Sequence, residues 1–185
     1  MSDFLLKIQK DLLGCVKCEL CKFRTSIVFG EGNPQAKLMF IGEAPGKEED
    51  KAGRPFVGNA GKLLTKMIHS MHLKREDVYI CNIIKCRPPL NRRPTVVEIL
   101  ACIPVLIKQI DSIKPEVIVT LGACAYQSLF NSIESISKVA GIWKVYQGIS
   151  VMPTYHPSFL LRCPKFKKYV WRDLKLVMDK LRGDI

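Results

Sequence analysis

Four short runs of consecutive apolar residues, rich in Val and Ile, recur along the chain, and each ends at a loop residue. They cover residues 37–42, 78–84, 116–122 and 149–156. Continuous apolar runs of this length are typical of parallel strands that are buried on both faces. The pattern therefore predicts a central, mostly parallel sheet of four strands.

Helical spacing of apolar residues marks the segments between and after these runs. It predicts helices over residues 60–71, 95–113 and around 123–131, the second of which opens with Thr95 and Glu98 at capping-box spacing. A last apolar stripe near the C-terminus consists of Val170, Leu174, Val177 and Leu181. Strands that alternate with helices predict an α/β fold in three layers, α/β/α.

The size and composition of the chain fit one folded domain. Its 185 residues are 48% hydrophobic and 25% charged, which is typical of a globular protein. No stretch approaches the ~20 uninterrupted apolar residues of a membrane span. The first residues, MSDFLLKIQKDLLG, are amphipathic and interrupted by Lys and Asp, unlike a signal peptide. We expect a single domain over residues 1–185, monomeric and cytoplasmic, with no membrane partner.

Polar side chains follow the predicted strands at the points where they end. Gly42 and Glu43 follow the first run, Asn82 lies near the end of the second, Gly122 ends the third and His156 ends the fourth. In open α/β sheets, ligands bind beyond the carboxyl ends of the strands. We therefore expect an acid, an amide and an imidazole to converge on one edge of the sheet.

The charge balance favours a polyanionic partner. Lys and Arg number 29 against 17 Asp and Glu, which gives a net charge of +12 and a pI near 9.4. Such a basic domain points first to nucleic acid. The alternative is a solvated lysine surface that keeps the protein soluble.

The cysteines suggest a metal or cluster site. Cys15, Cys18 and Cys21 form a C-x2-C-x2-C motif, Cys86 follows the second strand, and Cys102 lies in the next predicted helix. Cytosolic thiols stay reduced, so a disulfide framework is disfavoured, and zinc or an iron–sulfur cluster is favoured. The distance in sequence between the motif and the later cysteines excludes a compact zinc finger. The remaining thiols are expected to be ordinary or incidental: Cys81, Cys124 and Cys163.

Four segments in order, GEAPGKEED, GRPFVGNAGKLL, NIIKCRPPLNRRPT and TYHPSFLLR, resemble the family 4 uracil-DNA glycosylases, the iron–sulfur branch of that superfamily. The resemblance runs from about Cys15 to the final helix. It implies a monofunctional enzyme that flips uracil out of DNA and hydrolyses its N-glycosidic bond. The abasic site that remains would start base excision repair. The expected partners are uracil-containing DNA, single- or double-stranded, and replication or repair proteins.

The resemblance also implies a cofactor, a [4Fe–4S] cluster. The family's ligand positions fall on Cys15, Cys18, Cys86 and Cys102. Cys21 departs from the usual pattern, in which that position varies. Such a site would tie the N-terminal segment to the loop and helix after the second strand.

The resemblance places a base pocket at the strand ends, with motif A from Gly42 to Gly46 and motif B at His156. Phe56 would stack on the extruded ring. Asn82 would pair with uracil O4 and N3–H, and the reversed pattern of cytosine would leave the amide unpaired. His156 would donate to O2 as negative charge gathers on the leaving base.

Two acids near motif A receive roles as hypotheses. Some branches of the superfamily have an Asp where this chain has Ala44, so we expect a dissociative reaction in which water captures an oxocarbenium-like sugar. Glu43 would line the pocket and stabilise that cation, which makes it a catalytic candidate with His156. Glu49 would crowd the C5 position and exclude the methyl group of thymine.

Two segments are expected to contact DNA. The loop HPSFLLR has apolar tips, and Phe159, Leu160 or Leu161 could wedge into the base stack, with Arg162 on phosphate or in the gap. The Pro-stiffened loop RPPLNRRPT suits contacts to the backbone. Its arginines are Arg87, Arg92 and Arg93.

Two alternatives from other functional classes stay open at this point. An iron–sulfur electron-transfer protein or redox sensor would explain the cysteines but leave the strand-end residues without a role. A zinc-stabilised, non-catalytic nucleic-acid-binding module would explain the charge and the cysteines. It would not explain the convergence of Asn82 and His156.

Overall fold

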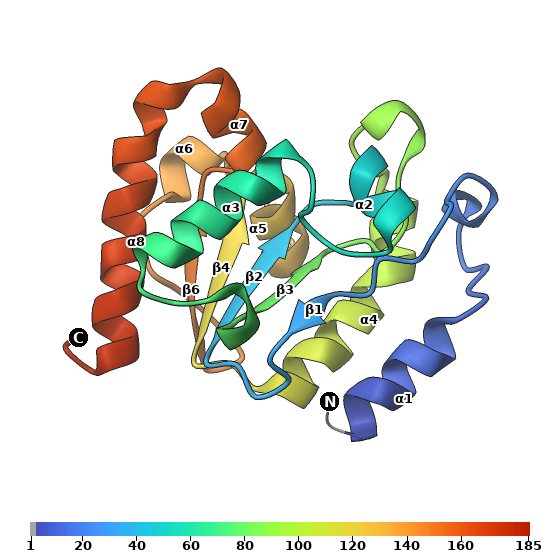
Figure 1. Cartoon of the computed structure of the whole chain (residues 1–185), viewed down its shortest axis with the longest axis horizontal. Helices are drawn as coiled ribbons and strands as arrows, with labels where there is room; N and C mark the ends of the chain where they lie inside the picture. Colours follow the sequence, from blue (N-terminus) through green and yellow to red (C-terminus); the bar gives the residue numbers. More distant parts are fainter. Residues whose placement is uncertain (1–2) are drawn as a thin grey trace.

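A computed structural model describes residues 3–185 of the chain (Figure 1). The helices are α1 (Asp3–Leu12), α2 (Lys47–Ala52), α3 (Asn59–Ser70), α4 (Val96–Ile113), α5 (Ala123–Phe130), α6 (Ile136–Val139), α7 (Pro157–Arg162) and α8 (Lys167–Arg182). The strands are β1 (Glu31–Gly32), β2 (Leu38–Gly42), β3 (Tyr79–Asn82), β4 (Val117–Leu121), β5 (Lys144–Tyr146) and β6 (Ile149–Thr154).

The strands form one sheet in the order β1-β3-β2-β4-β6-β5. The four inner strands are parallel and coincide with the four predicted apolar runs, so this part of the prediction is confirmed. The sheet nevertheless has six strands instead of four, because β1 and β5 pair antiparallel at its two edges. Both are very short and partly exposed, so neither has the continuous apolar run of a buried strand.

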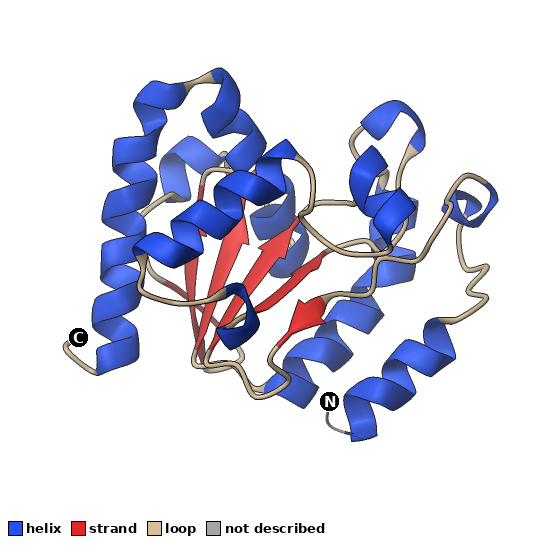
Figure 2. Ribbon diagram, viewed as in Figure 1, coloured by secondary structure: helices blue, strands red, loops and turns tan. Residues whose placement is uncertain are grey.

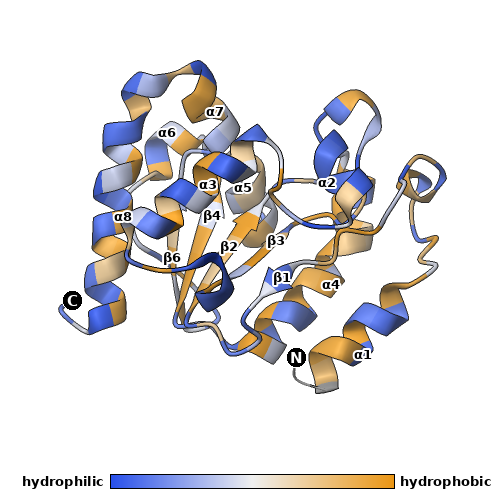
Figure 3. Ribbon diagram, viewed as in Figure 1, coloured by the Kyte–Doolittle hydropathy of each residue, from blue (hydrophilic) through white to orange (hydrophobic). Residues whose placement is uncertain are grey.

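Helices cover both faces of the sheet, which confirms the predicted three layers (Figure 2). Successive strand residues point to opposite faces. Met39 and Ile41 of β2 join the core beneath α1, α4 and α5, whereas Phe40 joins the core beneath α3, α7 and α8. The inner strands are therefore hydrophobic along most of their length (Figure 3).

The predicted start of α4 is confirmed in detail. Thr95 caps the helix, because its hydroxyl oxygen accepts from the Glu98 N–H at 3.3 Å. The Glu98 carboxylate in turn accepts from the Thr95 N–H at 2.8 Å. This reciprocal pair satisfies two donors that a helix start leaves without partners.

The order of the strands positions the site. The chain moves from β2 to β3 on one side and later to β4 on the other side, so the direction of winding switches at β2. A crevice opens at such a switch point, beyond the carboxyl ends of the strands. Gly42 pairs in register with Asn82, and the Gly122 N–H donates to the Thr154 carbonyl at 2.8 Å, so these strand ends share one edge.

No helix within residues 3–185 is long and apolar enough to span a membrane.

Candidate active site

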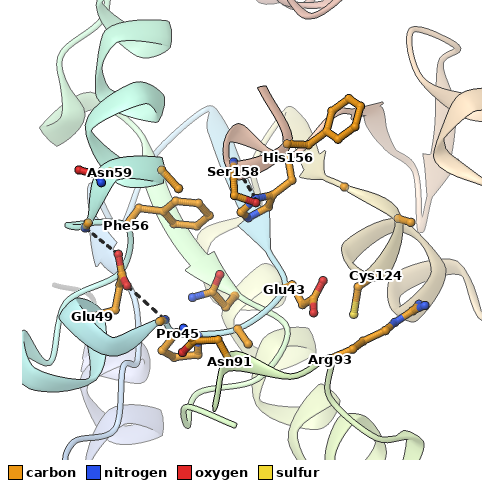
Figure 4. Close-up of a pocket in the computed structure, with 18 of the residues that line it drawn as sticks. Glu43, Pro45, Glu49, Phe56, Asn59, Asn91, Arg93, Cys124, His156 and Ser158 are labelled. Carbon is orange, nitrogen blue, oxygen red and sulfur yellow. Dashed lines mark hydrogen bonds between the residues drawn. The ribbon is translucent and has the colours of Figure 1, made fainter. Parts of the chain in front are cut away.

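A cleft of about 870 Å³ lies beyond the carboxyl ends of the parallel strands (Figure 4). The structure brings most of the predicted pocket residues together there. Those that line the cleft are Glu43, Ala44, Glu49, Phe56, Asn82 and His156. The convergence expected from the strand ends is therefore observed.

Phe56, Gly42 and Asn82 are packed so closely that a side chain at Gly42 would not fit. A Cβ atom there would lie 2.4 Å from Asn82 Oδ1 and 2.5 Å from Phe56 Cζ. Phe56 itself has φ of 52°, an uncommon left-handed conformation for an aromatic residue. A Cβ atom on Gly61 of α3 would lie 1.9 Å from the Phe56 carbonyl oxygen. Two glycines thus allow the ring to lie beside the amide.

Asn82 presents an unpaired acceptor at the bottom of the cleft. Its side chain is 1% exposed, and Oδ1 has no hydrogen-bond partner among the described residues. A buried polar atom without a partner costs about 1–3 kcal/mol. Its backbone carbonyl, by contrast, accepts from Lys85 Nζ at 2.7 Å. The geometry therefore fits a ligand that brings an N–H donor to Oδ1.

His156 is held as a neutral imidazole with its proton on Nε2. It caps α7, because the Ser158 N–H donates to Nδ1 at 3.1 Å, so Nδ1 is the acceptor nitrogen. Burial above all, together with the nearby positive charge of Arg162, lowers the pKa of His156 to about 4, although the negative charge of Glu49 opposes the shift. The ring centroid lies 5.7 Å from that of Phe56. An Nε2–H donor therefore stands beside the aromatic ring.

Glu43 projects into the cleft near Cys124 and Arg93 (Figure 4). Burial raises the pKa of the Glu43 carboxyl above its ordinary value, whereas the Arg93 charge and a hydrogen bond from the Cys124 thiol oppose this rise. An anion in this position would favour a cationic species in the cleft.

Glu49 joins the two loops that form one wall of the cleft. Its Oε2 accepts from the Gly46 N–H at 3.1 Å, and its Oε1 accepts from the N–H groups of Val57 and Gly58 at 2.9 and 2.8 Å. A carboxylate that accepts three backbone N–H groups fixes the loops relative to each other. The structure places Glu49 at the cleft wall. Its predicted role against the thymine methyl stays a prediction.

A second carboxylate, Glu31, supports the same wall from outside through Arg75. Arg75 Nε donates to Glu31 at 2.7 Å, its Nη1 donates to Thr65 Oγ1 at 3.1 Å, and its Nη2 donates to the Pro55 carbonyl. The Arg75 side chain is only 19% exposed. Arg75 therefore holds the residue that precedes Phe56.

The two leucines expected at the DNA have different environments. Leu160 is 1% exposed and packs in the core beneath α3, α7 and α8, so the expectation that it contacts DNA is wrong. In α7 the side chain of Leu160 points into this core, whereas the next residue, Leu161, is 47% exposed. Arg162 is exposed and lines the cleft.

The arginines of the loop after β3 are partly engaged within the protein. Arg92 makes a two-pronged ion pair with Glu98, at 2.8 and 2.6 Å, which anchors the loop to α4. Arg87 donates to Asn91 Oδ1 at 2.8 Å. Arg93 is exposed and lines the cleft near Glu43. Of the three, Arg93 is the one whose charge acts on Glu43.

Several cleft residues were not anticipated from the sequence. Cys124 was expected to be an ordinary thiol, yet it lines the cleft and contacts Glu43. Its position two residues after Gly122, at the end of the third apolar run, is the signal that could have identified it. The other unanticipated residues include Asn59, Asn91, Tyr155, Ser158 and Phe166.

A separate small cavity gathers the four cysteines expected to bind a cluster. They are Cys15, Cys18, Cys86 and Cys102. All are free thiols, and Arg24 donates to Cys86 Sγ at 3.3 Å. Among residues 3–185, no three His, Cys, Asp or Glu side chains are grouped so as to hold a metal ion. Four cysteine thiols are the ligand set of structural zinc sites and of iron–sulfur clusters alike.

Comparison with known proteins identifies relatives across most of the chain. The model of the uracil DNA glycosylase superfamily matches residues 29–175. A type-4 uracil-DNA glycosylase of Saccharolobus solfataricus is 49% identical, over 97% of this chain and 87% of its own length. The one from Sulfurisphaera tokodaii is 48% identical over 96% and 84%. The one from Thermotoga maritima is 51% identical over 80% and 78%.

Replacing Arg75 by Met should displace Phe56, because the Pro55 carbonyl loses its donor. We expect kcat/KM for the reaction in the cleft to fall about tenfold, which corresponds to a loss of ~1.4 kcal/mol in transition-state stabilisation. The matched control is Arg54→Met, which removes the exposed Glu31 ion pair at 2.7 Å and should cost less than about twofold. In a Phe56→Ala background, Arg75→Met should have little further effect. An equal loss in both backgrounds would contradict this positioning role.

His156 should stay neutral in the folded protein until the pH approaches about 4. A histidine in the unfolded chain has a pKa of ~6.5. Between about pH 4 and pH 6.5 the unfolded chain therefore binds more protons than the folded chain. The stability that depends on His156 is therefore complete above about pH 6.5 and is lost as the pH falls toward 4. NMR titration of the imidazole, with urea unfolding of wild type and His156→Gln, checks this. A midpoint near 6.5 in the folded protein would disprove it.

Proposed function

Because this chain belongs to the uracil-DNA glycosylase superfamily, we propose that it releases uracil from DNA by hydrolysis of the N-glycosidic bond. The product would be an abasic site, the starting point of base excision repair. The observation that carries the proposal is the buried, unpaired Oδ1 of Asn82 beside the ring of Phe56 and the imidazole of His156. These three groups match one face and the polar edges of a pyrimidine.

Recognition begins with extrusion of the base, because its glycosidic bond is inaccessible inside the duplex. Phe56 stacks on the ring, an interaction worth ~1–3 kcal/mol. Oδ1 of Asn82 accepts from uracil N3–H, and the amide NH₂ donates to O4. Cytosine offers an acceptor at N3 and a donor at C4, so both pairings would fail and the wrong base would be rejected.

Cleavage moves the electron pair of the C1′–N1 bond onto the leaving base. His156 donates from Nε2 to uracil O2 and stabilises this negative charge as an oxyanion hole does. A neutral imidazole suits the role, because its proton stays on Nε2 while Ser158 holds Nδ1. The sugar becomes an oxocarbenium ion, which the Glu43 carboxylate stabilises through space. Water adds to C1′, and the proton that it loses neutralises the uracil anion, which leaves as the free base.

The DNA strand would reach the cleft past exposed side chains of α7 and of the loop after β3. Leu161 is the apolar tip that would enter the gap left by the extruded base, with Arg162 beside it. Arg93 would face the backbone at the opposite side of the cleft. Arg92 would act indirectly, because its ion pair with Glu98 fixes the loop that carries Arg93.

Cys15, Cys18, Cys86 and Cys102 would hold a [4Fe–4S] cluster. The support is that these four thiols line one cavity, whereas Cys21 is outside the described lining. When bound, the cluster supplies a covalent tie between the N-terminal segment, the loop after β3 and α4. Arg24, which donates to Cys86, would balance part of its negative charge.

Uracil release from an oligonucleotide tests the proposed activity. We expect the purified protein to free uracil from single- and double-stranded substrates. Asn82→Ala and His156→Ala should each lower kcat by about 100-fold or more, because a buried transition-state contact is lost. His69→Ala, on the exposed side of α3, is the matched control and should remain active. Binding of DNA without any release of uracil would refute the glycosylase function and favour a binding module.

Metal analysis of cysteine variants tests the cofactor. The wild-type protein should contain about four irons per chain, with visible absorption typical of a cluster. Cys86→Ser and Cys102→Ser should lose iron and unfold at lower temperature, whereas Cys21→Ser and Cys163→Ser should retain both properties. One zinc per chain in place of iron would contradict the cluster assignment.

A further inference from the structure

A second cavity, of about 520 Å³, lies beside the active-site cleft at the start of α8. We refer to it as the side cavity. Its walls are mainly basic and aromatic, with Lys165, Phe166, Lys168, Tyr169 and Arg172 among them. Ser137, Tyr155 and Phe166 line both the side cavity and the cleft, so the two are neighbours across a shared wall. Tyr155 directly precedes His156 in the chain.

The side cavity is positively charged. Lys165 and Lys168 are exposed, and neither forms an ion pair with a carboxylate in the described part of the chain. The acid in the lining, Asp173, is 0% exposed. Its carboxylate accepts from the Thr154 hydroxyl at 2.7 Å and from Arg172 at 3.2 Å. Its charge is therefore engaged inside the protein, and the lysines remain available for an anion.

Helix stability does not explain the position of Lys168. Lys167 and Lys168 lie in the first turn of the 16-residue helix α8, which has no acid in that turn. Cations at a helix N-terminus oppose the macrodipole and cost stability, typically ~0.3–1 kcal/mol each. The charge pattern is thus unfavourable for the isolated fold and becomes favourable when an anion binds there.

Aromatic rings accompany the charges. Tyr169 is 41% exposed, with Lys168 Nζ 5.1 Å from its ring centroid. Its ring lies 5.8 Å from Phe166, which in turn lies 5.0 Å from Tyr155. Cationic grooves with exposed aromatic rings are typical of sites for single-stranded nucleic acid, in which phosphates contact the cations and unstacked bases contact the rings.

We propose that the side cavity binds the part of the DNA strand that directly adjoins the extruded uridine, on one side of it. Lys165 and Lys168 contact the phosphodiester, and Tyr169 contacts the sugar or base of a neighbouring nucleotide. The positive charge of the cavity and the wall that it shares with the cleft both favour this part of the DNA strand as its ligand. The inference rests on the proposed function, because the uridine in the cleft places the strand.

The experiment measures KM for uracil release from single-stranded oligonucleotides of graded length. One series extends the flank 5′ of the uracil from about two to about six nucleotides, and the other extends the 3′ flank. For the wild type, KM should fall on extension in one series only. In Lys165→Gln/Lys168→Gln, the ratio of short-flank to long-flank KM in that series should approach one. The slope of log KM against log salt concentration should become smaller by about 0.7 for each phosphate contact that the variant loses.

Two comparisons make the outcomes decisive. Lys175→Gln, an exposed lysine farther along α8, is the charge-matched control and should keep the wild-type length dependence. Tyr169→Ala should lose part of this length dependence, although the substitution leaves the charge of the cavity unchanged. Equal behaviour of the double variant and the control would overturn the side-cavity proposal while uracil release by the wild type upholds the glycosylase function. No release by the wild type would instead overturn the proposed function, and this inference with it.

Discussion

The absence of a side chain at Gly42 is the constraint on which the site depends. The end of β2 lies in register with Asn82 of β3, and the Phe56 ring lies against both. No Cβ atom fits between them, so the amide and the aromatic ring meet directly beside the cleft. The loops that bring the ring there are fixed by two acids, Glu49 through backbone N–H groups and Glu31 through Arg75. Both loops are therefore held in place by hydrogen bonds within the protein.

A buried lysine connects the base pocket with the cysteine cavity. Lys85 is 0% exposed and lines the cavity that gathers the cysteines, and its Nζ donates to the Asn82 carbonyl at 2.7 Å and to Gln109 Oε1 at 2.6 Å. Gln109 of α4 continues the network to Tyr79 of β3 at 3.1 Å. A buried amino group is costly unless it is hydrogen-bonded, so loss of either partner would destabilise the fold. The network therefore fixes Lys85 against the end of β3. The same lysine therefore lines the cysteine cavity and contacts the residue that would read the base.

Sequence reasoning succeeded where a local pattern carries the structure. Continuous apolar runs identified the four inner strands, and the rule that ligands bind at strand ends placed Asn82 and His156 in one cleft. The edge strands were missed because two or three partly exposed residues carry no such pattern. The contact of Arg75 with Pro55 and that of Cys124 with Glu43 join segments distant in sequence, so only the folded chain reveals them. Leu160 was misplaced because six residues of α7 are too few to show which leucine faces inward.

A crystal structure of the protein with uracil-containing DNA or with free uracil tests the central claim most directly. The account predicts that the pyrimidine ring lies against Phe56, with N3–H within hydrogen-bond distance of Asn82 Oδ1 and O2 beside His156 Nε2. The acceptor that is unpaired among the described residues would then have its partner. A base bound elsewhere, or one bound in the cleft with Asn82 Oδ1 still unpaired, would contradict the account.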